Sequence, residues 1–288
     1  AVSLDLNSPA PRQYAAGAMG APLAVFNFVA STTAGVAEDV TLTSLNLTQN
    51  VTDPAQASYQ DYSLLYLVDA NGRIVASAVP TSTSVYFQLN PGTVIVRTND
   101  TGGASLTLKA NLSNIGPQYN VAVGGHKLGY GVASPLHMNA IGMSTANPVS
   151  IYYLAWPRPT GATHIMYKGI PTVNILPANG KLSSETDIYR FTVSAGSSDI
   201  GLYKFTSHVG MVSVQMNAIE LYDVTTPSEV LLYSASTIGR GNDFVEDMYF
   251  DPMGIGQRTE VIVTAGQTRT FVIRGRFGGM VAGSVVST

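Results

Sequence analysis

The sequence predicts an all-β protein built from two tandem β-sandwich domains with an immunoglobulin-like fold. Short segments of alternating apolar and polar residues recur along the chain, separated by Gly, Pro and Asn, which is typical of sandwiches. No stretch of ten or more residues has a convincing helical pattern. The segment Val25–Asp69 is echoed at Ile188–Asp223, and a repeat of this length indicates one structural unit used twice.

The two copies of the repeat share the same order of features. A strand ends near Phe28 in the first copy and near Phe191 in the second. An acidic turn and a second strand follow, and a third strand ends in Asp69 or Asp223. Each copy then has a closing strand, and Arg274 of the second copy falls where Lys109 falls in the first. The inward residues of the two closing strands are Leu106, Leu108, Ala110 and Leu112, and Phe271, Ile273, Gly275 and Phe277.

The length, charge and cysteine content of the chain limit the classes of function that it could have. A chain of 288 residues is long enough for two domains with their own cores. Charged residues make up 11% of the chain, against about 25% in a typical soluble protein. We interpret this deficit as surface covered by copies of the same chain or by glycan; a soluble sandwich rich in Ser, Thr and Asn is the alternative. The net charge of −3 argues against a nucleic-acid partner, and the lack of cysteine excludes disulfides and thiolate metal sites.

The chain also has features of an exported protein. No run approaches the roughly 20 apolar residues of a membrane span. No signal peptide is present, and the sequence begins at Ala1 rather than Met, which fits a processed, secreted protein. We therefore expect an extracellular or cell-surface location.

The N-terminal segment, residues 1–9, is expected to be a donor strand. Ala1–Asn7 alternates, and Pro9 ends the pattern because proline cannot donate to a sheet. The apolar residues on one face are Val2, Leu4 and Leu6. Tyr14–Leu23 is rich in Gly and Ala, and we expect it to be mobile. A flexible tether of about 14 residues has a reach of roughly 20 Å, enough for the first strand to enter a neighbouring sandwich.

The remaining elements follow in order. Asp69–Gly72 is a turn signal, with Gly72 supplying a positive φ. In the first domain, strands are expected at 25–47 (two strands), 64–68, 73–79, 85–89, 93–97, 105–112 and 149–156. Pro157–Gly161 is the expected linker, which gives domains of 1–158 and 159–288. Ile170–Leu176 is the counterpart of the N-terminal strand, and Ser284–Thr288 is expected to be one more short strand.

No catalytic motif or cofactor site is recognisable. The sequence contains no G-x-S-x-G and no P-loop. The four histidines, His126, His137, His164 and His208, lack metal-ligand spacing. Weak candidates for a metal are the acidic residues Asp243, Glu246 and Asp247, although a solvated loop between strands explains them better. We expect no metal and no cofactor.

Four N-x-S/T sequons lie in the first domain, and they are candidates for glycosylation in an exported protein. A chain rich in Ser and Thr also produces such sequons by chance. The asparagines are Asn46, Asn50, Asn99 and Asn111.

Several motifs resemble a known group of proteins. VSLDLNSP, APLAVFNFVAS, EDVTLTSL, LYLVDANG and LTLKANL in the first half, and MYKGIPTVN, YRFTVSA, DIGLYKFT and LYD in the second, resemble β-sandwich modules of surface proteins from Patescibacteria, the candidate phyla radiation bacteria. The resemblance covers most of the chain. It implies an immunoglobulin-like fold, export and a cell-surface setting, and it supplies no catalytic residues. Since the chain has no additional domains of that group, we expect a self-contained subunit.

The leading hypothesis is a subunit of an extracellular, pilus-like filament. A free N-terminal strand that enters a neighbour's sheet gives head-to-tail contacts, and such contacts generate filaments of identical chains. A planar surface-layer lattice is a variant of this hypothesis. A monomeric adhesin or carbohydrate-binding module is a second hypothesis, with glycans or the surface of a host or neighbouring cell as partner. An enzyme is the third, with Asp199 paired with Asp243 or Asp247.

Overall fold

The computed structural model describes residues 1–30, 38–51, 53, 55–98, 102–116, 122–132, 134–153, 158–178, 182–250 and 260–288. The chain divides into two compact units, Ala1–Lys168 (unit 1) and Gly169–Thr288 (unit 2). Nearly all the regular structure is β, so the predicted all-β class is confirmed. Among the described residues, neither of the two short helices has the length or hydropathy of a membrane-spanning helix.

Unit 1 contains β1 (Val2–Leu4), β2 (Gln13–Ala15), β3 (Ala21–Phe28), β4 (Val40–Gln49), η1 (Tyr59–Asp61), β5 (Tyr62–Asp69), β6 (Ile74–Ala78), β7 (Ser84–Gln88), β8 (Ile95–Val96), β9 (Ala104–Leu112), β10 (Lys127–Leu128), β11 (Tyr130–Gly131), η2 (Pro135–His137), β12 (Met138–Gly142) and β13 (His164–Tyr167). Unit 2 contains β14 (Thr172–Leu176), β15 (Glu185–Ser194), β16 (Ile200–Leu202), β17 (Lys204–Val212), β18 (Gln215–Asp223), β19 (Val230–Ser236), β20 (Asp243–Tyr249), β21 (Val261–Val263), β22 (Thr268–Gly278) and β23 (Val285–Ser287).

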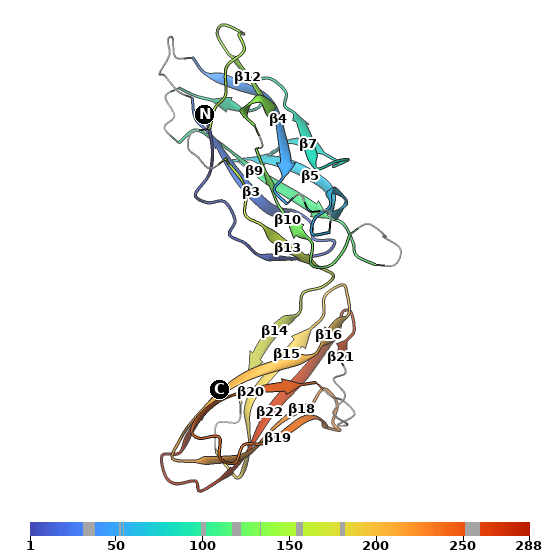
Figure 1. Cartoon of the computed structure of the whole chain (residues 1–288), viewed down its shortest axis with the longest axis vertical. Helices are drawn as coiled ribbons and strands as arrows, with labels where there is room; N and C mark the ends of the chain where they lie inside the picture. Colours follow the sequence, from blue (N-terminus) through green and yellow to red (C-terminus); the bar gives the residue numbers. More distant parts are fainter. Residues whose placement is uncertain are drawn as a thin grey trace. The chain divides into compact units, whose positions relative to one another are not determined.

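Each unit has a five-stranded antiparallel sheet of the same order (Figure 1). In unit 1 the order is β1-β3-β9-β5-β6, and in unit 2 it is β14-β15-β22-β18-β19. The repeat predicted from the sequence is therefore a repeat of topology. The closing strands of the repeat, β9 and β22, are the central strands of the two sheets.

The alternation of apolar residues decides which face of each sheet is buried. The inward residues predicted for β9 and β22 are all buried, in separate cores of unit 1 and unit 2. In unit 2 the Phe191, Phe205 and Phe271 rings stack at centroid distances of 4.9 and 5.4 Å. Aromatic contacts of this kind add to the stabilisation that comes from burying apolar area.

The outward faces of the two central strands also correspond. Lys109 lies opposite Tyr66, and Arg274 lies opposite Glu220. Nε of Arg274 lies 2.8 Å from an Asp187 oxygen, and its guanidinium lies over the Tyr222 ring, 4.7 Å from the centroid. Unit 2 thus carries a charged network where unit 1 carries a single lysine on that strand.

The second layer of each unit is organised around one long strand. In unit 1, β4 has β7 and β8 on one side and β11 and β12 on the other. In unit 2, β17 has β20 on one side and β23 on the other. The prediction of a short C-terminal strand at Ser284–Thr288 is confirmed by β23.

The boundary between the units lies ten residues after the predicted one, between Lys168 and Gly169. The expected linker belongs to unit 1, because Thr160 forms a bridge with Gly131 and the following β13 pairs with β2 and β10. Pro159 favours extended backbone in this segment without ending the domain. The predicted first domain, 1–158, is therefore ten residues too short, and the predicted second domain, 159–288, is ten residues too long.

Two further local predictions have opposite outcomes. The turn at Asp69–Gly72 is confirmed, with Gly72 at a φ of +80°. The strand expected at Val149–Trp156 is wrong for its described part, 149–153, which makes a single isolated bridge, between Tyr153 and Val2. Trp156 and Asn179–Gly180 lie outside the described residues.

Candidate functional site

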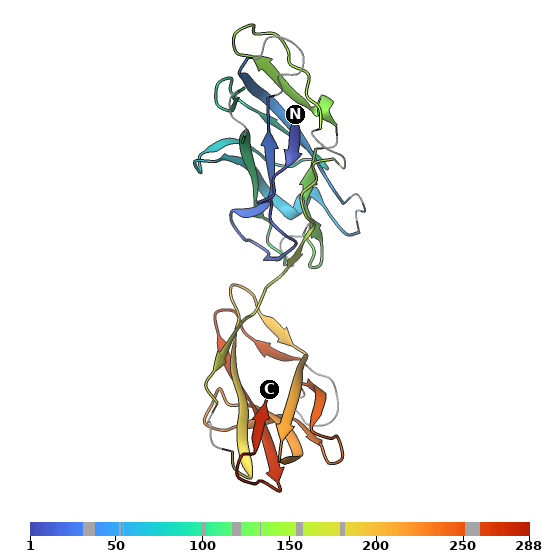
Figure 2. The same cartoon turned by 90° about the vertical axis from the view of Figure 1, so that its left-hand side faces the viewer.

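The N-terminal strand β1 pairs with β3 of its own unit, and the two strands lie side by side (Figure 2). Val2 is fully buried and lies opposite Phe28 in the antiparallel ladder. The amino group of Ala1 donates a hydrogen bond to the carbonyl oxygen of Val29 at 2.7 Å, and burial lowers the pKa of this amine. In the isolated chain, β1 is therefore an edge strand of unit 1.

The other two apolar residues of this segment face solvent. Leu4 is 37% exposed, and Leu6 is fully exposed. The expected strand Ala1–Asn7 is too long, because β1 ends at Leu4 and the chain turns there. The Asp5 carboxylate accepts a hydrogen bond from the backbone N–H of Asn7 at 2.8 Å, which stabilises this turn. Only the first of the three apolar residues therefore reaches the core.

The segment Tyr14–Leu23, which we expected to be a mobile tether, is anchored instead. β2 pairs in parallel with β13, and β3 already begins at Ala21. The N–H of Ala16 donates to the carbonyl oxygen of Tyr167 at 2.7 Å. The connection between β1 and β2 is consequently residues 5–12, which is much shorter than the tether we expected.

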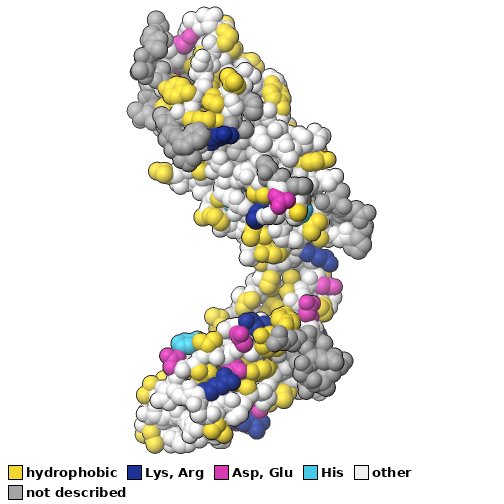
Figure 3. All heavy atoms as spheres, viewed as in Figure 1, with side chains coloured by type: hydrophobic (Ala, Val, Ile, Leu, Met, Phe, Trp, Pro, Cys, Tyr) yellow, Lys and Arg dark blue, Asp and Glu magenta, His cyan; other side chains and the backbone are white. Residues whose placement is uncertain are grey.

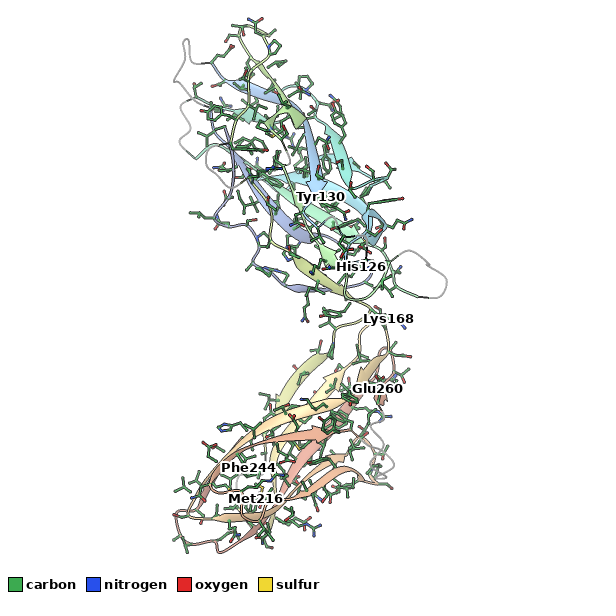
Figure 4. All side chains as sticks on the ribbon, viewed as in Figure 1. His126, Tyr130, Lys168, Met216, Phe244 and Glu260 are labelled. Atoms are coloured by element: carbon green, nitrogen blue, oxygen red, sulfur yellow. The ribbon has the colours of Figure 1, made fainter. Side chains whose placement is uncertain are left out.

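A buried polar cluster in unit 1 joins residues that are distant in the sequence. Figure 4 labels two of its members, His126 and Tyr130. Nδ1 of His126 lies 2.9 and 3.0 Å from the two carboxylate oxygens of the fully buried Asp61. The Tyr62 hydroxyl accepts a hydrogen bond from the N–H of Gly129 at 2.9 Å, and its ring packs edge-on against Tyr130. Burial raises the pKa of the Asp61 carboxyl, while the hydrogen bond to His126 opposes this rise.

This cluster has part of the geometry of a general base, but it holds no accessible reacting group. A histidine oriented by a carboxylate needs a nucleophile or substrate within reach of its ring. His126 is buried, and so is the Tyr130 hydroxyl, which has no hydrogen-bond partner in the described part of the chain. The pair therefore fastens the loop before β10 to η1. Sequence reasoning missed it because Asp61 and His126 are 65 residues apart.

The other histidines do not converge. His164 is buried, and its Nε2 lies 3.1 Å from the carbonyl oxygen of Leu23. His208 is exposed, and its Nε2 lies 2.5 Å from an oxygen of Asp243. The side chain of His137 is outside the described part of the structure. In the described ranges, no three His, Cys, Asp or Glu side chains are close enough to hold a metal ion.

The acidic metal candidates lie on β20, and strand alternation separates them. Asp243 and Asp247 point outward, where Asp247 accepts hydrogen bonds from Thr206 at 2.6 Å and Lys204 at 3.1 Å. Glu246 is buried on the opposite face and bonds with Tyr233 and Arg240. The expectation of a solvated loop here is wrong, because these residues form a strand. Asp199 instead accepts a hydrogen bond from the N–H of Ala265 at 2.8 Å.

The glycosylation candidates lie on or beside strands of unit 1, except Asn99, which is outside the described residues. The Asn50 side chain donates a hydrogen bond to the carbonyl oxygen of Gly161 at 3.0 Å. The Asn111 side chain accepts one from the N–H of Gly20 at 3.0 Å, and the Oδ1 of Asn46 is buried. The Asn50 Nδ2 that makes this hydrogen bond is also the atom that would carry a glycan. Glycosylation of all four asparagines stays a prediction.

The described surface combines few charges with many exposed apolar side chains. Figure 3 shows, on one face, only scattered Lys, Arg, Asp and Glu among hydrophobic and uncharged residues. In unit 2 the large exposed apolar residues include Val173, Ile175, Val212, Val245 and Val285. Isolated exposed apolar residues are normal. Of these five, Val173 and Ile175 lie together on β14, an edge strand of its sheet.

Comparison with known proteins does not assign the chain to a family. No family model and no curated protein matches it. Among solved structures, allantoicase aligns over 88% of this chain and 76% of its own, with 10% identity and a TM-score of 0.18. Procruciferin, an 11S globulin from Brassica napus, aligns over 99% of this chain and 86% of its own, with 8% identity and a TM-score of 0.15. A vicilin from Solanum melongena aligns over 98% and 84%, with 10% identity and a TM-score of 0.09. Likenesses this weak support no inference about function.

Proposed function

We propose that the chain is a structural subunit of an extracellular, pilus-like filament, assembled head to tail by donor-strand complementation with the N-terminal strand. The observation that carries this proposal is that the N-terminal strand pairs over a short length with its own unit and leaves apolar side chains exposed. A ladder of three residue pairs joins β1 to β3, Leu4 is partly exposed, and Leu6 is fully exposed. Transfer of the strand to a neighbour would keep Val2 buried and bury the two leucines as well.

The energetic gain of this exchange comes from the leucines. Burial of one exposed leucine side chain stabilises a complex by about 1.5–3 kcal/mol. Backbone hydrogen bonds are lost at one edge and regained at another, so they contribute little to the difference. The low charge content and the resemblance to surface modules of Patescibacteria also support an assembly outside the cell.

Electron microscopy of the purified chain, compared with a chain lacking residues 1–9, tests this proposal. We expect filaments from the full chain and dispersed particles from the truncated one. Flat two-dimensional arrays would replace the filament with a surface lattice, and dispersed particles in both samples would overturn the proposal.

A second variant guards against misfolding of the truncated chain. Leu4→Ser with Leu6→Ser changes one partly exposed and one fully exposed side chain, so the isolated chain should lose little thermal stability while it loses filaments. The matched control is Met19→Ser with Ile74→Ser, which removes two other exposed apolar side chains of unit 1 and should leave filaments intact.

A further inference from the structure

The two units provide an internal comparison of the same strand in two settings. Thr48 of β4 pairs with Ser84, the first residue of β7, and with Gly131 on its other side. Gly210 of β17 pairs in the same way with Asp243, the first residue of β20, and with Ser287 on its other side. Thr48 and Gly210 are therefore equivalent positions.

This register reveals an edge that unit 1 covers and unit 2 leaves open. In unit 1, β12 continues along β4, with Met138 opposite Leu45 and Ala140 opposite Leu42. Leu45 lies three residues before Thr48 and Leu42 lies six before it. The residues at the same distances before Gly210 in unit 2 are Ser207 and Lys204. Within the described residues no strand lies beside Lys204–Ser207 on that side, since β23 pairs only with Gly210–Val212.

The edge strands of the two five-stranded sheets, β1 in unit 1 and β14 in unit 2, also differ in how far they are covered. Val2 of β1 and Val173 of β14 occupy equivalent places, because their strands pair in the same way with β3 and β15. Val2 is fully buried, and it forms a parallel bridge with Tyr153. Val173 is 53% exposed and Ile175 is 70% exposed, although both lie on the same face as the buried Val193 and Phe191.

The cover of unit 1 comes from one continuous piece of chain. β12 lies against β4, and the segment that follows, Val149–Tyr153, packs against the core beside β1. The N–H of Val2 donates to the carbonyl oxygen of Tyr152 at 2.9 Å. Unit 2 has no such segment among its described residues. The open seam of unit 2 is bounded by Val173 and Ile175 of β14 and by Lys204–Ser207 of β17, with Phe205 half-buried between Tyr189 and Phe191.

We propose that the open seam of unit 2 receives the N-terminal strand of a second copy of this chain. The strand would lie parallel to β14, in the place that Val149–Tyr153 takes in unit 1. This inference rests on the proposed filament function and adds the acceptor site. A seam with an unpaired strand edge and exposed apolar side chains offers main-chain hydrogen bonds and apolar contacts together.

The sequence of Val149–Tyr153, the segment that covers this position in unit 1, indicates which strand would bind in the open seam of unit 2. That segment reads Val149-Ser150-Ile151-Tyr152-Tyr153, and the N-terminal strand reads Val2-Ser3-Leu4-Asp5-Leu6, with apolar residues at the same three positions. In this alignment Leu6 takes the place of Tyr153, which lies beside Val2 in unit 1, so Leu6 falls beside Val173. Donor and acceptor are on different units, so the contact is heterologous and does not require closure into a dimer.

Engineered cysteines test this register, because the chain has no cysteine of its own. One sample carries Leu6→Cys and the other carries Val173→Cys, and the two are mixed, assembled and oxidised. We expect a disulfide-linked heterodimer, because a disulfide requires Cα atoms within about 7 Å of each other. The matched acceptor control is Val230→Cys, an exposed valine on β19, the opposite edge strand of the same sheet. Cross-linking to Val173→Cys should exceed that to Val230→Cys by about ten-fold or more, on the same distance argument.

The same samples separate the failure of this inference from the failure of the proposed function. Filaments without preferential cross-linking to Val173→Cys would overturn the acceptor site and leave the filament in place. An absence of filaments from the unmodified chain would overturn both. As a check independent of disulfides, Val173→Glu with Ile175→Glu should abolish filaments and Val230→Glu should not. Filaments that persist in the double variant would also overturn the acceptor site.

Discussion

Two His–Asp pairs in this chain differ mainly in burial. Asp61 and His126 are buried in unit 1, whereas the side chains of His208 and Asp243 are 67% and 73% exposed. A buried ionisable group that loses its partner is left uncompensated, while an exposed pair is screened by water. The same two residue types therefore serve different purposes in the two units.

The residue-scale prediction compares the two pairs directly. His126→Ala should destabilise unit 1 by about 1–3 kcal/mol, because it removes one hydrogen-bond partner of the buried Asp61 carboxyl, which keeps the backbone N–H of Ser58. His208→Ala, the matched control, should change stability by less than about 1 kcal/mol. Calorimetric unfolding of the three chains measures both effects. Equal shifts in the two variants would contradict a structural role for the buried cluster.

At the scale of elements, the turn before β9 sets the start of the central strand of unit 1. Gly103 has a φ of +70°, and a Cβ at this position would lie 2.3 Å from the carbonyl oxygen of Phe28 on β3. Gly72, in the turn between β5 and β6, has a similar φ of +80° with open space around it. Both glycines need the left-handed region, but only Gly103 is also packed against backbone.

The element-scale prediction follows from this contrast. Gly72→Ala should cost about 1 kcal/mol, the strain of a side chain in the left-handed region. Gly103→Ala should cost clearly more, because the added methyl group also forces β3 and β9 apart. Thermal unfolding of the two variants checks the order. A Gly103 variant as stable as the Gly72 variant would show that the β3–β9 contact relaxes without cost.

At the scale of the whole molecule, each unit has its own core. The buried apolar residues of unit 1 and those of unit 2 form two separate clusters with no shared member. A domain with its own hydrophobic core is in principle able to fold alone. The repeat thus gives the chain two sandwiches of related topology, one with its seam closed and one with its seam open.

The whole-molecule prediction is that each unit folds by itself when it is cut at the observed boundary. Residues 1–168 and 169–288, produced separately, should each show a β-type circular dichroism spectrum and a cooperative thermal transition. A cut at the boundary predicted from the sequence, residues 1–158, should be less stable, because it removes β13 from its pairing with β2. Equal stability of 1–158 and 1–168 would contradict the assigned role of β13.

The sequence by itself determined the all-β class, the repeat and the inward residues of its strands. These depend on local alternation, which a single strand expresses without its neighbours. The phase of β9 against β22 was correct for this reason, and so was the turn at Gly72. Local patterns also explain the errors, since the alternation of Ala1–Asn7 says nothing about the turn that Asp5 stabilises.

Only the tertiary structure decided which strand edges are covered. The pairing of β13 with β2, the contact of His126 with Asp61 and the cover of Val2 by Val149–Tyr153 all join segments distant in the sequence. Such contacts depend on which distant segments the chain brings beside a given strand. The alternation of residues within one strand carries no information about its neighbours. Val2 and Val173 therefore look alike as sequence, and differ in burial because the segment that covers one has no described counterpart beside the other.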